Sequence, residues 1–208
     1  MEWELRFSEE KPRIAIIVSR LHHSLMDVLH RHSIGELQGV FMAIISNHAK
    51  LKSAVERHDI LFHFFPITPE NKQVQEEKEL ELLDSLEVDL VILARYTPVL
   101  SKVFVSCYPN RIINIPHTFL PAFAGTGPCA QAHARGVKLI GATIQYVAPV
   151  VDEGPIIEQD VVRVSHRDTV EDLVRKGGDI ERIVFARAVR HRLERPVLPC
   201  ANRTVVFN

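Results

Sequence analysis

The chain has 208 residues, a size that suits one α/β domain with a substantial core. Hydrophobic residues make up 46% and charged residues 25%, which is an ordinary globular composition. The net charge of −1 gives no broad basic field for a nucleic acid or an anionic membrane, and no apolar run approaches the length of a membrane span.

The cysteines and the amino terminus indicate where the protein works. Cys107, Cys129 and Cys200 are widely spaced and odd in number, so they predict neither a disulfide framework nor a cysteine-rich zinc site. The first residues are acidic and polar and do not resemble a signal peptide. We therefore expect a cytoplasmic protein, with residues 1–11 as a leader or linker remnant and 12–208 as one domain.

The first half of the chain alternates predicted strands with predicted helices. Short apolar runs rich in β-branched residues predict buried strands at 13–18, 40–46, 60–67, 88–96 and 111–115. Helices are expected between them: one over 19–37 that ends near Gly35, one over about 50–58, one that opens at Thr68 and Pro69, and one over 101–107.

After a loop rich in Pro and Gly, the pattern predicts a helix that closes at Gly136 and then two strands, 138–147 and 155–164. A long helix over 167–194 is expected to be interrupted at Gly177 and Gly178, and 203–207 is a terminal strand. Alternating strands and helices predict a mostly parallel open sheet flanked by helices, with ligands at the carboxyl ends of its strands.

Polar residues collect at those predicted strand ends. Arg95 and Tyr96 end the fourth strand, and Asn114 ends the fifth, directly before a loop with His117. Asp152 precedes a Gly-Pro turn. Each has an ordinary alternative, since Asp favours turns and Asn often holds a loop in place. The functional interpretation is a carboxylate that accepts a proton and an amide that donates to a developing oxyanion.

Several longer segments resemble the formyltetrahydrofolate deformylase family of the formyltransferase superfamily. They include RIAIIVSRLHHSLMDVL, VDLVILARYTPVLS, RIINIPHTFLPAF, GVKLIGATIQYV, VDEGPIIEQDVVRVSHRDTVEDLVRKG and NRTVVF, which together cover nearly all of 13–207. The resemblance implies a formyltransferase-like Rossmann-type fold that acts on a reduced folate, without the family's amino-terminal regulatory domain. The family tends to form oligomers, so the resemblance implies a possible homo-oligomer, although no pattern in this sequence indicates one.

The family's chemistry depends on an Asn-x-His element, a second His in the following strand and an Asp before the Gly-Pro turn. Asn114 and Asp152 match, so the resemblance makes them catalytic. Pro116 replaces the first His, and His117 matches a neighbouring histidine that the deformylases carry. Gln145 replaces the second His, and an amide can hydrogen-bond but cannot titrate.

The resemblance also implies the residues that border the folate. They are Arg95, Tyr96, Pro98, Leu100, Gln145 and Val147. Pro98 lies in a loop whose backbone the family uses to hydrogen-bond the pterin, and proline supplies an acceptor there but no N–H donor. No metal ligand set is expected, and no cofactor beyond the folate substrate.

Three functions fit these residues. The first is hydrolysis of 10-formyltetrahydrofolate to formate and tetrahydrofolate, with Asp152 activating water, Asn114 binding the oxyanion and His117 taking part of the missing imidazole's role. The second is hydrolysis of 5,10-methenyltetrahydrofolate, whose cationic carbon needs no oxyanion-hole acid. The third is a folate binder that has lost the reaction. The loop VSRLHHS lacks the Gly-rich run that would bind a phosphate-bearing acceptor, so water is the expected acceptor.

Overall fold

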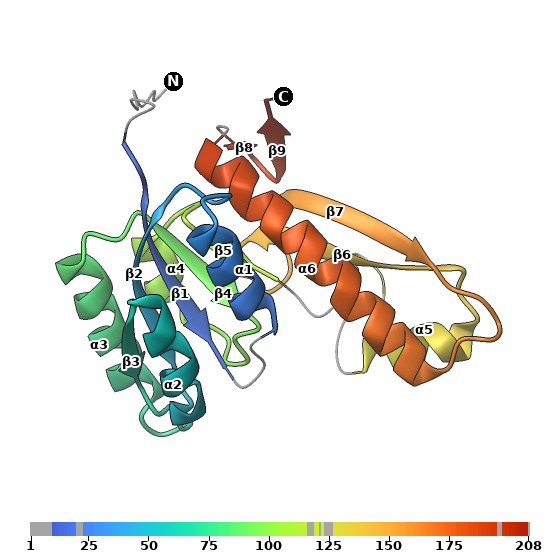
Figure 1. The fold of residues 1–208 in the computed structure, drawn as a ribbon, viewed down its shortest axis with the longest axis horizontal. Helices are drawn as coiled ribbons and strands as arrows, with labels where there is room; N and C mark the ends of the chain where they lie inside the picture. Colours follow the sequence, from blue (N-terminus) through green and yellow to red (C-terminus); the bar gives the residue numbers. More distant parts are fainter. Residues whose placement is uncertain are drawn as a thin grey trace.

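In the computed structural model, the residues that the structure describes are 10–19, 23–115, 119–120, 122, 127–194 and 197–207. Seven strands form one sheet in the order β3-β2-β1-β4-β5-β6-β7 (Figure 1). They span Arg13–Val18 (β1), Val40–Ser46 (β2), Leu61–Phe64 (β3), Leu90–Ala94 (β4), Ile112–Asn114 (β5), Leu139–Tyr146 (β6) and Ile156–Arg163 (β7). The first five are parallel, and β6 and β7 are antiparallel to their neighbours, so the predicted mostly parallel sheet is confirmed.

Six α-helices are assigned among the described residues. They span His23–Ser33 (α1), Lys52–Val55 (α2), Lys72–Ser85 (α3), Lys102–Cys107 (α4), Pro128–Arg135 (α5) and Val170–Glu194 (α6). Short 3-10 turns flank α2, at Ala49–Leu51 and Glu56–His58. None of the helices in the described ranges combines the length and apolar character that a bilayer crossing requires.

The two faces of the sheet are covered by different helices, which explains the continuous apolar character of the central strands. Along β1, Ile14, Ile16 and Val18 pack in one cluster with residues of α1 and α6. Ala15 and Ile17 point the other way, into a cluster that contains residues of α3 and α4. Figure 1 shows α1 and α6 in front of the sheet and α3 on its left, beside β3. A strand buried on both faces has no polar side, so its sequence does not alternate.

Two predicted helix boundaries are wrong, and one strand was not predicted. The helix expected to open at Thr68 begins at Lys72, because the side chain of Asn71 accepts from the Thr68 N–H at 2.7 Å and builds a turn first. The helix α6 runs through Gly177 and Gly178 without interruption. The terminal strand β9 (Arg203–Val206) pairs with β8 (Val197–Cys200), which was not predicted, in a separate two-stranded sheet.

The glycines of α6 and of the turn before β7 make a matched pair of stability tests. At Gly178 an added Cβ meets no atom within 4 Å, so Gly178→Ala should raise the free energy of unfolding by about 0.5–1 kcal/mol, the usual helix-interior gain. At Gly154 the added Cβ would lie 1.7 Å from the backbone oxygen of Tyr146, so Gly154→Ala should lower it by about 3 kcal/mol. Urea unfolding measures both, and equal effects would contradict this packing.

Candidate active site

Asn114 and Gln145 lie side by side at the junction of the parallel and antiparallel parts of the sheet. Asn114 is the last residue of β5, and its register partner on β6 is Gln145. On its other side Asn114 is paired with Leu93 of β4. The sheet therefore fixes the backbone of Asn114 from both sides at the carboxyl end of β5, which is where open α/β sheets place ligands.

Asp152 comes to the same place from the turn between β6 and β7. The Nε2 group of Gln145 donates a hydrogen bond to Oδ1 of Asp152 at 3.2 Å. The residue adopts a positive φ of 61°, which Asp tolerates better than most residues. The turn is closed by the Tyr146 N–H, which donates to the Pro155 carbonyl at 2.9 Å. Three residues from two strands and one turn thus form a polar cluster: Asn114, Gln145 and Asp152.

Gln145 has unused hydrogen-bonding capacity inside this cluster. Its side chain is only 2% exposed, and its Oε1 atom has no hydrogen-bond partner among the described residues. A buried acceptor without a partner is costly, so native proteins satisfy such atoms with water or ligand. Gln145 therefore has two roles in the cluster. Its Nε2 atom holds the carboxylate of Asp152, and its Oε1 atom can accept a hydrogen bond from water or a ligand.

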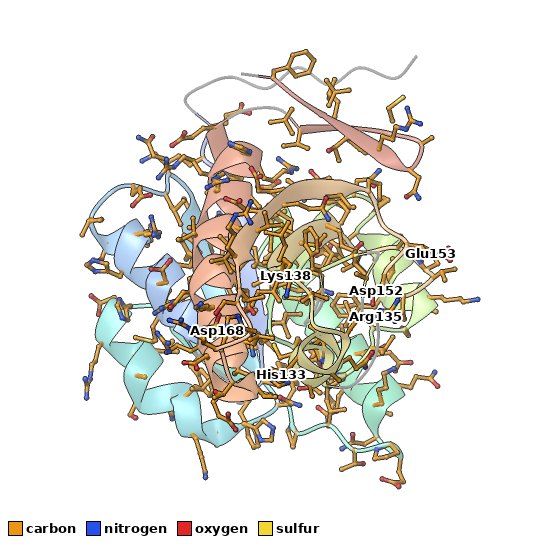
Figure 2. All side chains as sticks on the ribbon, turned by 90° about the vertical axis from the view of Figure 1, so that its right-hand side faces the viewer. His133, Arg135, Lys138, Asp152, Glu153 and Asp168 are labelled. Atoms are coloured by element: carbon orange, nitrogen blue, oxygen red, sulfur yellow. The ribbon has the colours of Figure 1, made fainter. Side chains whose placement is uncertain are left out.

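Asp152 and Glu153 are the acidic residues of the turn between β6 and β7. Figure 2 shows Asp152 near Glu153 and well separated from Asp168, which lies beside α6. Asp168 accepts from Lys176 Nζ at 2.8 Å, and this bond is the main reason that the pKa of Asp168 is lowered. Asp168 is therefore paired with α6, and Asp152 is the carboxylate that Gln145 contacts.

Leu100 and Val147 are part of one apolar wall, and Val147 directly follows β6. Leu100 is buried, and Val147 packs partly buried against the same apolar cluster, which also holds Phe104 and Ile112. The N–H of Val147 donates to the Ile112 carbonyl at 2.9 Å, which ties the end of β6 to β5. The contact of both residues with the pterin stays a prediction.

Arg95 forms an ion pair with Glu181 of α6. Its Nε donates to Oε1 of Glu181 in α6 at 2.7 Å, and a second bond joins its Nη2 to Oε2 of Glu181. These hydrogen bonds raise the pKa of Arg95. The Ser24 hydroxyl of α1 donates to the same carboxylate at 3.2 Å. Arg95 itself has a positive φ of 53°, and its predicted folate contact stays a prediction.

Tyr96 and Pro98 lie in the loop that follows β4. Tyr96 is buried, and its hydroxyl has no partner among the described residues. Pro98 is half-buried, and the next residue but one is Leu100 of the apolar wall. The Thr97 N–H donates to the Ser19 hydroxyl after β1 at 3.1 Å, which fixes the loop to the neighbouring strand end. The predicted folate contacts of Tyr96 and Pro98 remain predictions.

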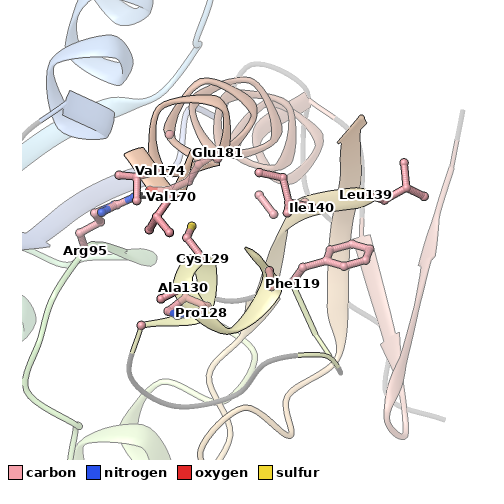
Figure 3. A pocket seen from close by; sticks show the side chains of 16 residues that line it. Arg95, Phe119, Pro128, Cys129, Ala130, Leu139, Ile140, Val170, Val174 and Glu181 are labelled. Carbon is pink, nitrogen blue, oxygen red and sulfur yellow. Dashed lines mark hydrogen bonds and ion pairs between the residues drawn. The ribbon is translucent and has the colours of Figure 1, made fainter. Parts of the chain in front are cut away.

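An apolar cavity lies between α5, α6 and β6. Its volume is about 330 Å³, and its lining includes Arg95, Glu181, Val174, Ile140 and Cys129 (Figure 3). Neither Asn114 nor Asp152 lines it. Burial raises the pKa of the Cys129 thiol, which disfavours the reactive thiolate. In the described ranges, no group of three or more His, Cys, Asp or Glu residues is placed to hold a metal ion.

Two predicted positions cannot be placed. Pro116 and His117 lie outside the residues that the structure describes. Three buried acidic residues were missed by sequence reasoning: Glu181 in α6, and Glu76 and Glu79 in α3. The sequence did hold one indication for α3. Glu76 and Glu79 precede Leu83 at spacings of three and four residues, so they share the helix face of a buried leucine.

Comparison with known families identifies the chain. Residues 12–189 match the formyl transferase family. The chain belongs to the formyl transferase family. This membership agrees with the resemblance of the sequence motifs and with the observed sheet, in which the family region covers β1 to most of α6.

Individual members of the formyl transferase family are similar along the whole chain. Formyltetrahydrofolate deformylase of Synechocystis is 55% identical over 99% of this chain and 72% of its own length. The Bacillus subtilis deformylase is 48% identical over 100% of this chain and 69% of its own length.

Solved structures of the formyl transferase family have the same fold. The crystal structure of formyltetrahydrofolate deformylase from Burkholderia mallei superposes with a TM-score of 0.95 at 45% identity, covering 100% of this chain and 74% of that one. Glycinamide ribonucleotide transformylase 1 from Symbiobacterium toebii superposes with a TM-score of 0.88 at 30% identity, covering 99% of each chain. The deformylases are thus the more similar of these relatives.

Proposed function

We propose that this chain hydrolyses 10-formyltetrahydrofolate to formate and tetrahydrofolate. Relatives named formyltetrahydrofolate deformylase at 44–55% identity support the substrate and the reaction class. The observation that carries the chemistry is the contact of Gln145 with Asp152 beside Asn114, which brings a carboxylate, a primary amide donor and an unsatisfied acceptor to one strand edge.

Asp152 is the proposed general base. Its carboxylate accepts a proton from water while the water oxygen forms a bond to the formyl carbon. Gln145 holds Oδ1, so Oδ2 is the atom that faces the water. The positive φ of Asp152 and the closed turn keep this carboxylate in one orientation, which reduces the entropy lost on reaching the transition state.

Asn114 is the proposed oxyanion donor. The attack places negative charge on the former formyl oxygen, and the side-chain N–H of Asn114 donates to it. The bond between the carbon and N10 then breaks, N10 takes the proton, and formate and tetrahydrofolate leave. We assign the delivery of that proton to Asp152 with help from His117. The proposal needs no cofactor beyond the folate substrate.

The direct test is incubation of the purified protein with each one-carbon tetrahydrofolate in turn. We expect stoichiometric formate and tetrahydrofolate from the 10-formyl compound. Formyltetrahydrofolate formed from the 5,10-methenyl compound, without release of formate, would instead favour a cyclohydrolase reaction. Binding measured by calorimetry without any product would identify a folate binder and end the hydrolase proposal.

The substitution Gln145→His tests the role of this non-titrating amide. An imidazole there would titrate near neutrality, and the adjacent Asp152 would favour its charged form. We expect kcat to increase at low pH, where the imidazolium donates to the oxyanion, and to fall as pH rises through the imidazole pKa. The pH dependence of kcat from pH 5 to 9 checks this, with Gln159→His, on β7, as the control.

We also place the protein in the cytoplasm. Its three cysteines are free in the structure, and free thiols are the rule in reducing compartments. Soluble reduced folate is the expected partner, with no nucleic acid or membrane surface required. Compartment-specific labelling of the tagged full chain in cells would test this placement.

A further inference from the structure

One buried carboxylate in α6 joins three separate elements of the fold. Glu181 is 6% exposed, and its Oε1 atom accepts from Arg95 Nε at 2.7 Å and from the Ser24 hydroxyl at 3.2 Å. Its Oε2 atom accepts a second bond from Arg95 Nη2. Arg95 directly follows β4, and Ser24 lies in the first turn of α1. Glu181 thus connects α6 with α1 and with the chain that leaves β4.

The β4–α4 loop, residues 95–101, carries four of the predicted folate contacts. Its middle and its end are fixed by hydrogen bonds to other elements. The Thr97 N–H donates to the Ser19 hydroxyl after β1 at 3.1 Å, and the Ser101 N–H donates to the buried carboxylate of Glu76 in α3 at 3.2 Å. The start of the loop is fixed by the ion pair with α6.

The start of this loop has special need of an anchor. Arg95 has a φ of 53°, in the left-handed region that costs free energy for a residue other than glycine. Its side chain also borders open space, because Arg95 and Glu181 line both the cavity of about 330 Å³ and a second one of about 380 Å³. Figure 3 shows the Arg95 side chain pointing toward α6 at the edge of the first cavity. A bidentate arginine–carboxylate pair has a defined geometry, so it can hold a side chain that packing leaves room to move.

We propose that Arg95 and Glu181 are positioning residues for folate binding, because their ion pair holds the start of the β4–α4 loop in place. Two of the donor atoms of Arg95 are occupied by Glu181, so Arg95 acts through the loop and not by touching the folate. The inference rests on the proposed function, which makes this loop a border of the folate site. A loop that moves weakens binding of the ground state and the transition state alike, which raises KM more than it lowers kcat.

The kinetic test is a double-mutant cycle with Arg95→Met, Glu181→Met and the variant that carries both changes. We expect KM for 10-formyltetrahydrofolate to rise about tenfold in each single variant and no further in the double variant, because all three lack the same pair. The value of kcat should stay within about threefold. If Arg95 bound the folate itself, Glu181→Met would leave KM within about twofold, and that result would overturn the proposal.

Urea unfolding of the same variants separates loop position from stability. Each single variant leaves one buried charge without its partner and should be less stable than the unmodified protein. The double variant replaces both charges with apolar side chains, so its unfolding midpoint should equal or exceed the original. A raised KM in this stable variant supports the positioning role, and an original KM there would overturn it. Arg95→Lys keeps the charge without the two-pronged geometry, so its KM should lie between the others.

Asp168→Asn is the matched control. Asp168 pairs with Lys176 of α6 at 2.8 Å, and both side chains are largely buried, as in the Arg95–Glu181 pair. Asp168 also accepts from the Ser165 N–H, so its pair joins α6 to the turn after β7 and not to the β4–α4 loop. This variant should keep KM within about twofold, although it too loses an ion pair of α6.

Amide hydrogen exchange separates this proposal from the proposed function, because it needs no substrate. Peptides that cover 97–101 should exchange about tenfold faster in the double variant than in the unmodified protein or in Asp168→Asn. Equal exchange in all three proteins would overturn the proposal. If the expected difference is found but no one-carbon folate is hydrolysed, the hold of the ion pair on the loop is supported and only the deformylase assignment is overturned.

Discussion

Asp152→Asn should lower kcat for 10-formyltetrahydrofolate hydrolysis by about 10²- to 10⁴-fold, the usual cost of losing a general base. The asparagine still offers an oxygen to Gln145 Nε2 and tolerates the positive φ of this position, so the turn should stay folded. Only the ability to take a proton from water is removed. We therefore expect a KM within a few-fold of the original and an unchanged midpoint of urea unfolding.

The control for this substitution is the next residue along the chain. Glu153 is exposed on the same turn (Figure 2), so Glu153→Gln removes one negative charge at almost the same place without touching Gln145. It should retain kcat within about twofold, because exposed charges contribute little. If Asp152→Asn keeps more than a tenth of the original kcat, Asp152 is not the base, and water must be activated by another group.

Asn114→Asp should lower kcat by about 10²- to 10³-fold, because it replaces an oxyanion donor with a negatively charged acceptor. The volume changes little, and the backbone pairing of β5 with Leu93 and Gln145 is unaffected. The loss should fall on kcat more than on KM, since the developing oxyanion exists only in the transition state.

Steady-state kinetics at saturating substrate checks the effect of Asn114→Asp, and Asn202→Asp supplies the control. Asn202 is exposed in the turn between β8 and β9, so the same change of chemistry there should leave kcat as it was. A variant at Asn114 that loses binding but keeps kcat would show that this amide contacts the folate in the ground state and does not stabilise the oxyanion.

The sequence patterns predict most of the sheet, because strands that are buried on both faces need continuous apolar runs. Runs such as the one at 13–18 have no polar side, and only a strand covered by helices on both faces tolerates that. The patterns failed where local chemistry offered alternatives. Asn71 bonds the backbone before α3, and the two glycines of α6 lack the positive φ that ends a helix.

The residues of the candidate site were predicted from the sequence, but only some of the contacts between them were. Asn114, Gln145 and Asp152 were singled out, and the antiparallel pairing of β5 with β6 brings them together. The partner of Arg95 was not predicted, because Glu181 is 86 residues away and the bond depends on where α6 crosses the sheet. The buried position of Glu79 was likewise missed, since an acidic helix segment usually faces solvent.

By itself, the sequence determined which side chains could do chemistry and that they stand at strand ends, since hydrophobic periodicity and turn residues are local properties of the chain. It also determined that Gln145 can hydrogen-bond but not titrate. Only the tertiary structure decided which polar groups meet: Gln145 with Asp152, Arg95 with Glu181, and Glu76 with the Ser101 N–H. Hydrogen bonds and desolvation act over a few ångströms of space, so their partners depend on packing and not on distance along the chain.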